Sequence, residues 1–291
     1  MERQPAGRLS FGITAGDRPW LADLGAALEQ WGFDAVWAND TPGRSGIAAL
    51  GAMAARTRRL ELGLGVAPLS ERSAAEITDE AGRSGLPLER LVLGVGSGAS
   101  RSLALVRDGV RELRELLPGQ RIAVAAVGPR MCRLAGELAD AVLLNWATPA
   151  RLEWAGDQVA AAAGRALRPA PTLAAYIRVA LGPGARDRLA REANRYARRA
   201  PWYAALMRDE SEVPMGIAIE ETDGVRERLA VALEPYRAVL DEAVVRGLPA
   251  GDDIGDWLLI AEAAAPLGQR PGYEPTGHER PGDAGFPTFG S

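Results

Sequence analysis

The chain has 291 residues, is 47% hydrophobic and carries a formal net charge of −4. This length is sufficient for one large domain or two small ones, and the mixed, mildly acidic charge argues against a nucleic-acid-binding surface. No apolar run reaches the roughly 18 residues of a membrane span, and residues 1–10 lack the apolar segment of a secretory signal. The single cysteine, Cys132, cannot form an internal disulfide, so we expect a cytoplasmic protein.

Two missing side-chain types narrow the chemistry further. All 34 basic residues are arginine, which excludes a Schiff-base lysine, a P-loop lysine and attachment of pyridoxal phosphate. The single histidine is His278, so neither a Ser-His-Asp triad nor a multi-histidine metal site can be built, and we expect no metal. Carboxylate, hydroxyl and arginine chemistry remains, or chemistry that an organic cofactor supplies.

Strand-like and helix-like patterns alternate along the chain. Short apolar or β-branched runs predict strands at residues 9–13, 35–37, 60–66, 90–93, 122–125, 141–144, 172–181 and 243–245. Apolar residues at helical spacing predict helices at residues 21–31, 47–54, 73–84, 103–117, 129–138, 149–165, 185–203, 225–240 and 254–264. Alternation of this kind indicates a parallel sheet with helices on its outer faces.

Eight strand–helix units in one chain of this length predict a single (β/α)₈ TIM barrel over residues 1–265. A doubly wound Rossmann sheet is the alternative. The segment between the seventh and eighth predicted strands is long enough to form an insertion. Residues 266–291 are rich in Pro and Gly without periodicity, and we interpret them as a C-terminal tail.

A glycine-rich turn follows the fourth predicted strand. Residues 94–99, Gly-Val-Gly-Ser-Gly-Ala, satisfy the loose dinucleotide fingerprint G-x-G-x-x-G/A. Three strand–helix units precede it, however, and the next strand ends at residues 123–128 without the carboxylate that would hold a ribose. An NAD-dependent dehydrogenase is therefore disfavoured, and the turn is better explained as one of several strand ends around a barrel mouth.

Small or polar residues also stand at the ends of the neighbouring strands. They occur at residues 39–41, 65–68, 96–98, 127–130 and 145–146. Because the active sites of TIM barrels form at the carboxyl ends of the strands, this pattern indicates room for a flat ligand at the barrel mouth. Gly128-Pro129-Arg130 opens a helix and so offers free amides and a cation to a phosphate.

Four segments resemble the luciferase-like monooxygenase superfamily. They are residues 32–40 (GFDAVWAND), 62–68 (LGLGVAP), 90–98 (RLVLGVGSG) and 128–145, the last being similar to the methylenetetrahydromethanopterin reductase branch. The resemblance covers residues 9–264. It implies a TIM barrel that uses FMN or the deazaflavin coenzyme F-420, and the fourth segment favours F-420.

The resemblance also assigns site residues. Asp40 corresponds to an acid near the reactive face of the ring, where it would position or protonate. The cofactor-binding positions fall on three strand ends: Gly65, Val66 and Ala67 in a backbone bulge behind the ring, often with a non-prolyl cis peptide; Gly96, Ser97 and Gly98 beside the ring; and Ala126, Val127, Gly128, Pro129 and Arg130 at the phosphate.

Some residues admit a simpler explanation. Asp40 would equally suit a cap of the following helix or an ion pair with an arginine. Thr41 stands where several F-420-dependent dehydrogenases carry histidine, so imidazole-assisted hydride transfer is not expected. Trp202, Tyr203 and Met207 lie at helical spacing in the insertion, which favours packing over contact with substrate.

Together, the residues and the resemblance predict an oxidoreductase that transfers a hydride between F-420 and a small-molecule substrate. Two alternatives stay open: an FMN-dependent monooxygenase that needs a separate flavin reductase, and a non-catalytic flavin-binding barrel. The resemblance implies a homodimer as one arrangement, because relatives often pair through helices near their second to fourth strands. We expect no nucleic-acid or membrane partner.

Overall fold

The computed structural model describes residues 7–199, 201–209 and 215–266. Nine strands share one sheet: β1 (Arg8–Thr14), β2 (Ala35–Asn39), β3 (Glu61–Pro68), β4 (Leu91–Gly96), β5 (Arg121–Ala126), β6 (Ala141–Asn145), β7 (Thr172–Leu181), β8 (Ile217–Ile219) and β9 (Glu242–Gly247). The helices are α1 (Leu21–Gln30), α2 (Gly46–Ala54), α3 (Ala74–Arg83), α4 (Leu103–Leu116), α5 (Pro129–Leu138), α6 (Pro149–Arg165), α7 (Ala185–Arg199), α8 (Pro201–Asp209), α9 (Val225–Arg237) and α10 (Ile254–Ala264).

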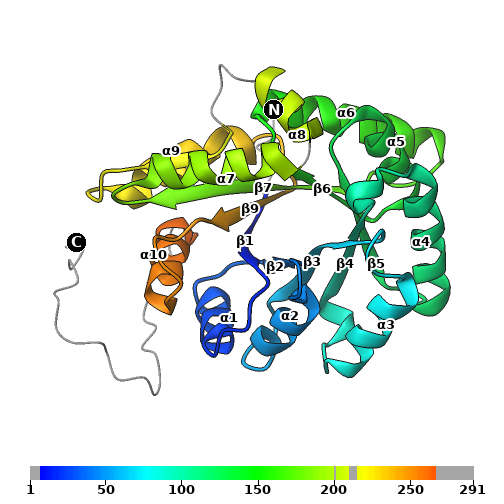
Figure 1. Ribbon diagram of the computed structural model, residues 1–291, viewed down its shortest axis with the longest axis horizontal. Coiled ribbons are helices and arrows are strands. Elements are labelled where there is room, and N and C mark those ends of the chain that lie inside the picture. The colour runs from blue at the N-terminus through cyan, green and yellow to red at the C-terminus, as the bar shows by residue number, and fades with distance from the viewer. Residues whose placement is uncertain (1–6, 200, 210–214, 267–291) are drawn as a thin grey trace.

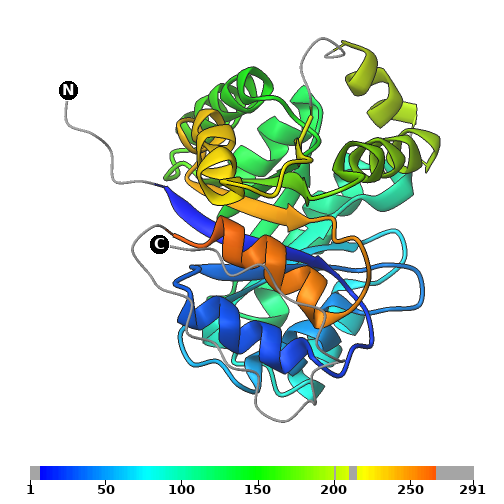
Figure 2. The same cartoon turned by 90° about the vertical axis from the view of Figure 1, so that its left-hand side faces the viewer.

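The sheet closes on itself as a parallel barrel, as the alternation predicted. The hydrogen-bonded order is β6-β5-β4-β3-β2-β1-β9-β7, and β7 also pairs with β6. Helices α1 to α6 follow one another around the outside of the strands in Figure 1. Figure 2, turned by 90°, shows the strands passing through the middle of the molecule with helices outside them. The Rossmann alternative is therefore excluded.

Two apolar clusters stabilise this arrangement. The larger one fills the space between strands and helices. The smaller one lies inside the barrel and includes Trp37, Leu143 and Tyr176. A Cβ atom on Gly12 would lie 2.9 Å from the ring of Tyr176, so a glycine here makes room for the larger side chain. Below these rings, buried Glu242 accepts hydrogen bonds of 2.6 Å from Ser10 and from the indole of Trp37.

The residues at the starts of several helices make the capping contacts that their side chains favour. Ser73 and Glu76 form a reciprocal capping box at the start of α3. Thr148 caps α6, and Pro149 occupies its first turn, where a missing N–H costs nothing. These contacts fix where each helix leaves the barrel rim.

The insertion after β7 differs from the prediction. A single helix was expected over residues 185–203, but α7 ends at Arg199 and α8 begins at Pro201. Residue 200, between them, lies outside the described part, and a proline at position 201 has no N–H to continue a preceding helix. Strand β8 was not predicted. It lies outside the closed barrel, paired with Val179–Leu181 at the end of β7.

The carboxyl-terminal part of the barrel ends with α10 at Ala264. The predicted tail starts at residue 266, and residues 267–291 lie outside the described part, as does His278. None of the helices within the described ranges is both long and apolar enough to cross a membrane.

Candidate functional site

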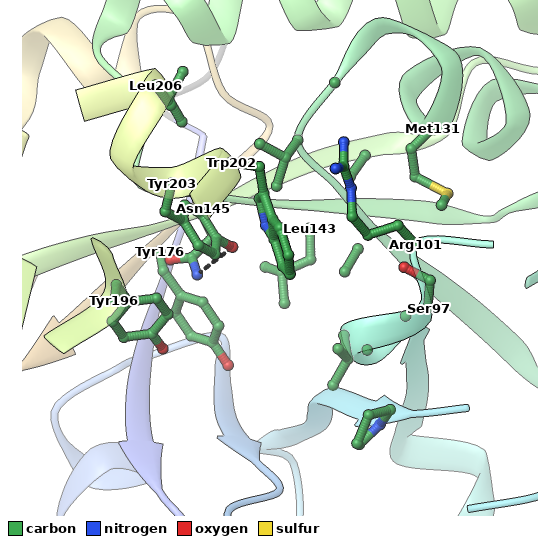
Figure 3. A pocket seen from close by; sticks show the side chains of 18 of the residues that line it. Ser97, Arg101, Met131, Leu143, Asn145, Tyr176, Tyr196, Trp202, Tyr203 and Leu206 are labelled. Carbon is green, nitrogen blue, oxygen red and sulfur yellow. Dashed lines mark hydrogen bonds between the residues drawn. The ribbon is translucent and has the colours of Figure 1, made fainter. Parts of the chain in front are cut away.

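A cavity of about 870 Å³ opens at the carboxyl ends of the barrel strands, between the strand ends and the insertion. Figure 3 shows Ser97, Arg101 and Met131 on one side of it and Tyr176, Tyr196 and Tyr203 on the other. Its position agrees with the general location of active sites in TIM barrels. The strand ends therefore converge on one open cavity, which lies where their small residues predicted room for a ligand.

Eleven of the twelve predicted site residues line this cavity: Asp40, Gly65, Val66, Gly96, Ser97, Gly98, Ala126, Val127, Gly128, Pro129 and Arg130. The exception is Ala67. It is fully buried behind the cavity wall and pairs with Val95 in the β3–β4 ladder. The side-chain direction alternates along a strand, so the neighbour of a wall residue points away from the cavity.

The wall behind the predicted ring position is a backbone bulge in β3. The β3–β4 register shifts between Leu64 and Ala67, and the Gly65–Val66 peptide bond is cis, as the resemblance implied. Tyr176 donates a 2.9 Å hydrogen bond to the carbonyl of Gly65. Desolvation raises the pKa of Tyr176 well above its ordinary value, so its hydroxyl stays protonated and continues to donate.

Space for this wall depends on glycine. A Cβ atom on Gly65 would lie 2.9 Å from Leu143 and 2.9 Å from Trp37, and closer still to the hydroxyl of Tyr176. Gly98 has φ = +57°, in the left-handed region that glycine adopts without strain. The cavity wall is thus formed by backbone rather than by side chains at the ends of both β3 and β4.

The far end of the cavity is the N-terminus of α5. Gly128 is the N-cap and has no side chain. Pro129 has no N–H and the amide of Met131 donates to the Gly128 carbonyl, so the amide of Arg130 is the one that the first turn offers to a ligand. A Cβ atom added there would meet nothing within 4 Å, so the backbone faces open space. Arg101, Arg130 and Arg151 line the same end. Amides at a helix N-terminus with nearby arginines form a suitable environment for a phosphate.

Asp40 is held by two partners. One carboxylate oxygen accepts a 2.7 Å hydrogen bond from the amide of Gly46 at the start of α2, and the other pairs with Arg72 at 2.7 Å. Arg72 in turn pairs with Glu80 of α3. Both simpler roles considered for Asp40, helix contact and ion pair, are therefore present, and the carboxylate also lines the cavity.

Sequence reasoning missed two arginines inside the barrel mouth. Arg178 of β7 and Arg246 of β9 line the cavity and are only 2% and 4% exposed. Arg178 donates to the amide oxygen of Asn145, and Arg246 donates to that of Asn39 at 3.0 Å. Both positions could have been identified from the sequence, because each is an arginine in an otherwise apolar run near the carboxyl end of a predicted barrel strand.

The insertion contributes aromatic side chains to the cavity. Tyr196, Trp202 and Tyr203 line it, whereas Met207 is not among the lining residues. Tyr203 also packs against the rings of Tyr196 and Trp202, so packing and a place in the cavity wall occur together. Asn145 donates a 3.0 Å hydrogen bond to the hydroxyl of Tyr203, drawn as a dashed line in Figure 3. Desolvation raises the pKa of Tyr203 to about 12. A periodic pattern cannot tell a helix that packs on the core from one that covers a cavity.

Comparison with known proteins agrees with this geometry. The chain is 28% identical over 184 residues to the 5,10-methylenetetrahydromethanopterin reductase of Methanolobus tindarius, a match that covers 51% of this chain and only 56% of that protein. An F-420-dependent secondary alcohol dehydrogenase, solved with an F-420–acetone adduct, superposes with a TM-score of 0.70 at 14% identity, covering 91% of this chain and 100% of that one.

A second solved structure contains the other cofactor. The oxygenating constituent of 3,6-diketocamphane monooxygenase from Pseudomonas putida, in complex with FMN, gives a TM-score of 0.61 at 15% identity, over 89% of this chain and 98% of that one. A family model described as luciferase-like monooxygenase matches residues 12–109 and 106–265. The matched residues comprise nearly the whole barrel, and the chain belongs to the luciferase-like monooxygenase family.

Proposed function

We propose that this protein is an F-420-dependent oxidoreductase that reduces a small organic acceptor by hydride transfer. The observation that carries the proposal is the form of the cavity. A wall of backbone at Gly65–Val66 and residues 96–98 suits a flat ring, and the open N-terminus of α5 suits a phosphate on the same molecule. The partial match to a 5,10-methylenetetrahydromethanopterin reductase supports F-420 over FMN, because a solved tetrahydromethanopterin reductase from Methanopyrus kandleri is described as coenzyme F-420-dependent.

The cavity residues fit such a cofactor by their chemistry. Gly128 leaves open space in front of the start of α5, where Arg130 offers its backbone amide and a cation. The hydrogen bond from Tyr176 fixes the carbonyl of Gly65, so the wall is set before a ligand arrives. When bound, reduced F-420 would supply a hydride that, with a proton from water, saturates an electron-poor C=C or C=N bond and leaves the deazaflavin oxidised.

The protein's own contribution is mainly orientation. Trp202 and Tyr203 cover the cavity from the insertion and reduce the access of water to it. We assign Asp40 a positioning role, because both of its oxygens are engaged by Gly46 and Arg72. It fixes the β2–α2 loop beside the cavity, where a small displacement of reacting groups is costly.

Titration of the purified protein with F-420, FMN and NADH, followed by fluorescence and absorbance, tests the proposal. We expect F-420 to bind most tightly, and reduced F-420 to be oxidised when an acceptor is supplied. Preference for FMN, with oxygenation of an organic substrate when a flavin reductase and NADH are supplied, would support the monooxygenase instead. Binding without turnover of any acceptor would favour a non-catalytic barrel, and exclusive binding of NADH would contradict the proposal.

A matched pair of glycine variants tests the phosphate end. Gly128→Val fills the open space before α5, so we expect an affinity for F-420 that falls about tenfold or more. Valine is a poorer N-cap than glycine, so the free energy of unfolding should fall by no more than about 1 kcal/mol. Gly164→Val in α6 is the control, since a Cβ atom there also meets nothing within 4 Å but lies outside the cavity. Equal affinities in the two variants would exclude α5 as the phosphate site.

A further inference from the structure

The inner side of the cavity holds two cations that the proposed cofactor does not account for. Arg178 and Arg246 project from the neighbouring strands β7 and β9 and are almost completely removed from solvent. The Nε atom of Arg178 and the Nη1 atom of Arg246 have no hydrogen-bond partner among the described residues. Buried guanidinium groups normally satisfy their N–H donors, so these two atoms indicate a missing acceptor.

The carboxylates around them are already engaged. Asp40 pairs with Arg72, and Glu192 of α7 pairs with Arg195 at 2.6 Å. Burial would raise the pKa of Glu192, but the hydrogen bond from Arg195 and the nearby positive charges outweigh it and lower the pKa. In the described part of the chain, neither Arg178 nor Arg246 has a carboxylate within ion-pair distance. The pair thus presents a surplus of positive charge.

Aromatic rings hold the two guanidinium groups in place. Arg178 lies 4.2 Å from the ring centre of Trp146 and 4.9 Å from that of Tyr196, and Arg246 lies 5.7 Å from that of Tyr176. A cation near the face of a ring is stabilised but not neutralised. The charge remains available to a ligand that enters the cavity.

The cofactor's phosphate has other cations to bind. Arg101 and Arg130 line the end of the cavity at α5, and Figure 3 shows Arg101 across the cavity from Tyr176 and Tyr196. Tyr176 contacts both the Gly65 carbonyl of the wall and the guanidinium of Arg246. The arginine pair therefore lies beside the wall that we assign to the ring, where an acceptor must approach.

We infer that Arg178 and Arg246 bind a carboxylate of the acceptor, so that the substrate is an organic acid anion. Each unpartnered N–H can donate to one of the two carboxylate oxygens, and arginine suits this planar acceptor better than any other side chain. Naming the bound anion as the acceptor rests on the proposed function. Binding of the anion itself does not, because it requires only these two arginines.

Calorimetric titration of the cofactor-free protein with trans-cinnamate, trans-cinnamamide and phenyl phosphate tests the inference. The first two ligands differ in the carboxylate alone, and we expect wild-type protein to bind cinnamate at least about tenfold more tightly. This comparison needs no variant. In Arg178→Gln and Arg246→Gln the preference should fall toward unity, Arg246→Lys should retain part of it, and the exposed control Arg165→Gln should retain all of it.

Several results would overturn the inference. Equal binding of cinnamate and cinnamamide by wild-type protein would show that there is no anion site. Much tighter, arginine-dependent binding of phenyl phosphate would show that the site binds a phosphate rather than a carboxylate. A tenfold loss of F-420 affinity in both glutamine variants, with the cinnamate preference intact, would assign the arginines to the cofactor. If F-420 fails to bind but the preference holds, the proposed function fails and the anion site stands.

Discussion

Replacing Gly65 by alanine is the sharpest test of the cavity wall. The new methyl group would lie 2.9 Å from Leu143 and from Trp37, and closer still to the Tyr176 hydroxyl. Ordinary carbon contacts begin near 3.5 Å, and these three neighbours are buried inside the barrel. Tyr176 must therefore move, and its hydrogen bond to the Gly65 carbonyl would weaken.

The expected cost follows from these contacts. Overpacking a closed site costs about 1–3 kcal/mol, and the loss of a neutral hydrogen bond adds about 1 kcal/mol. With a urea m-value of about 3 kcal/mol/M, the unfolding midpoint of Gly65→Ala should fall by about 0.7–1.3 M. Because the displaced wall is the one assigned to the ring, F-420 affinity should also fall by about tenfold or more.

Urea unfolding and F-420 titration of the same protein samples measure both effects. Gly82→Ala is the control: it lies in exposed α3, its Cβ atom would meet nothing within 4 Å, and helix propensity predicts a gain of about 0.5–1 kcal/mol. A Gly65→Ala midpoint within about 0.2 M of wild type, with normal F-420 binding, would refute the steric reasoning.

Three further outcomes are expected. In Asp40→Asn the ion pair with Arg72 is lost, so kcat should fall about tenfold while the Kd of F-420 stays within about threefold; unchanged turnover would contradict the positioning role. Burial alone would raise the pKa of Glu29, but hydrogen bonds from the backbone amides of residues 58–60 outweigh burial and lower the pKa. The carboxylate therefore stabilises the fold above the ordinary glutamate pKa, and this contribution is lost as the pH falls through the lower folded pKa. The urea midpoint of Glu29→Gln should depend less on pH than that of wild type over this acidic range, and parallel curves would disprove this. Desolvation raises the pKa of buried Cys132 to about 11, so a thiol reagent at about pH 8 should label it only after denaturation; rapid labelling of native protein would show that the site opens.

The barrel was predictable because its signal is repeated. Each strand–helix unit shows the same change from a short apolar run to helical spacing, and residues 172–181 coincide with β7 without correction. The three-residue β8 is too short to show such a pattern; it pairs with the end of β7, and its two isoleucines are buried in the apolar core. The boundary between α7 and α8 falls at residues 199–201, where Pro201 was a sequence signal for the start of a new helix.

The site was predictable to the extent that it is made of strand ends. Gly65, Gly96 and Gly98 stand at predicted strand ends, so the sequence indicates where backbone forms the cavity wall. The partners of Asp40 were not predictable, because Arg72 lies 32 residues away and meets it only after β3 returns to the barrel rim. Whether the side chains of Arg178 and Arg246 face the inside or the outside of the barrel likewise depends on how the sheet closes, which the sequence does not show.

The way the insertion joins the barrel has a consequence for how substrate preference can change. Its two ends are held together by the pairing of β8 with β7 and by a 2.8 Å hydrogen bond from the amide of Gly182 to the carbonyl of Ile219. The segment between these ends supplies Tyr196, Trp202 and Tyr203 to the cavity but none of the eight barrel strands. A segment of different length or sequence can therefore be joined at the same two ends while the β3 bulge and the N-terminus of α5 stay intact. Residues 184–216 are thus the segment to vary when the cavity is redesigned for another ligand.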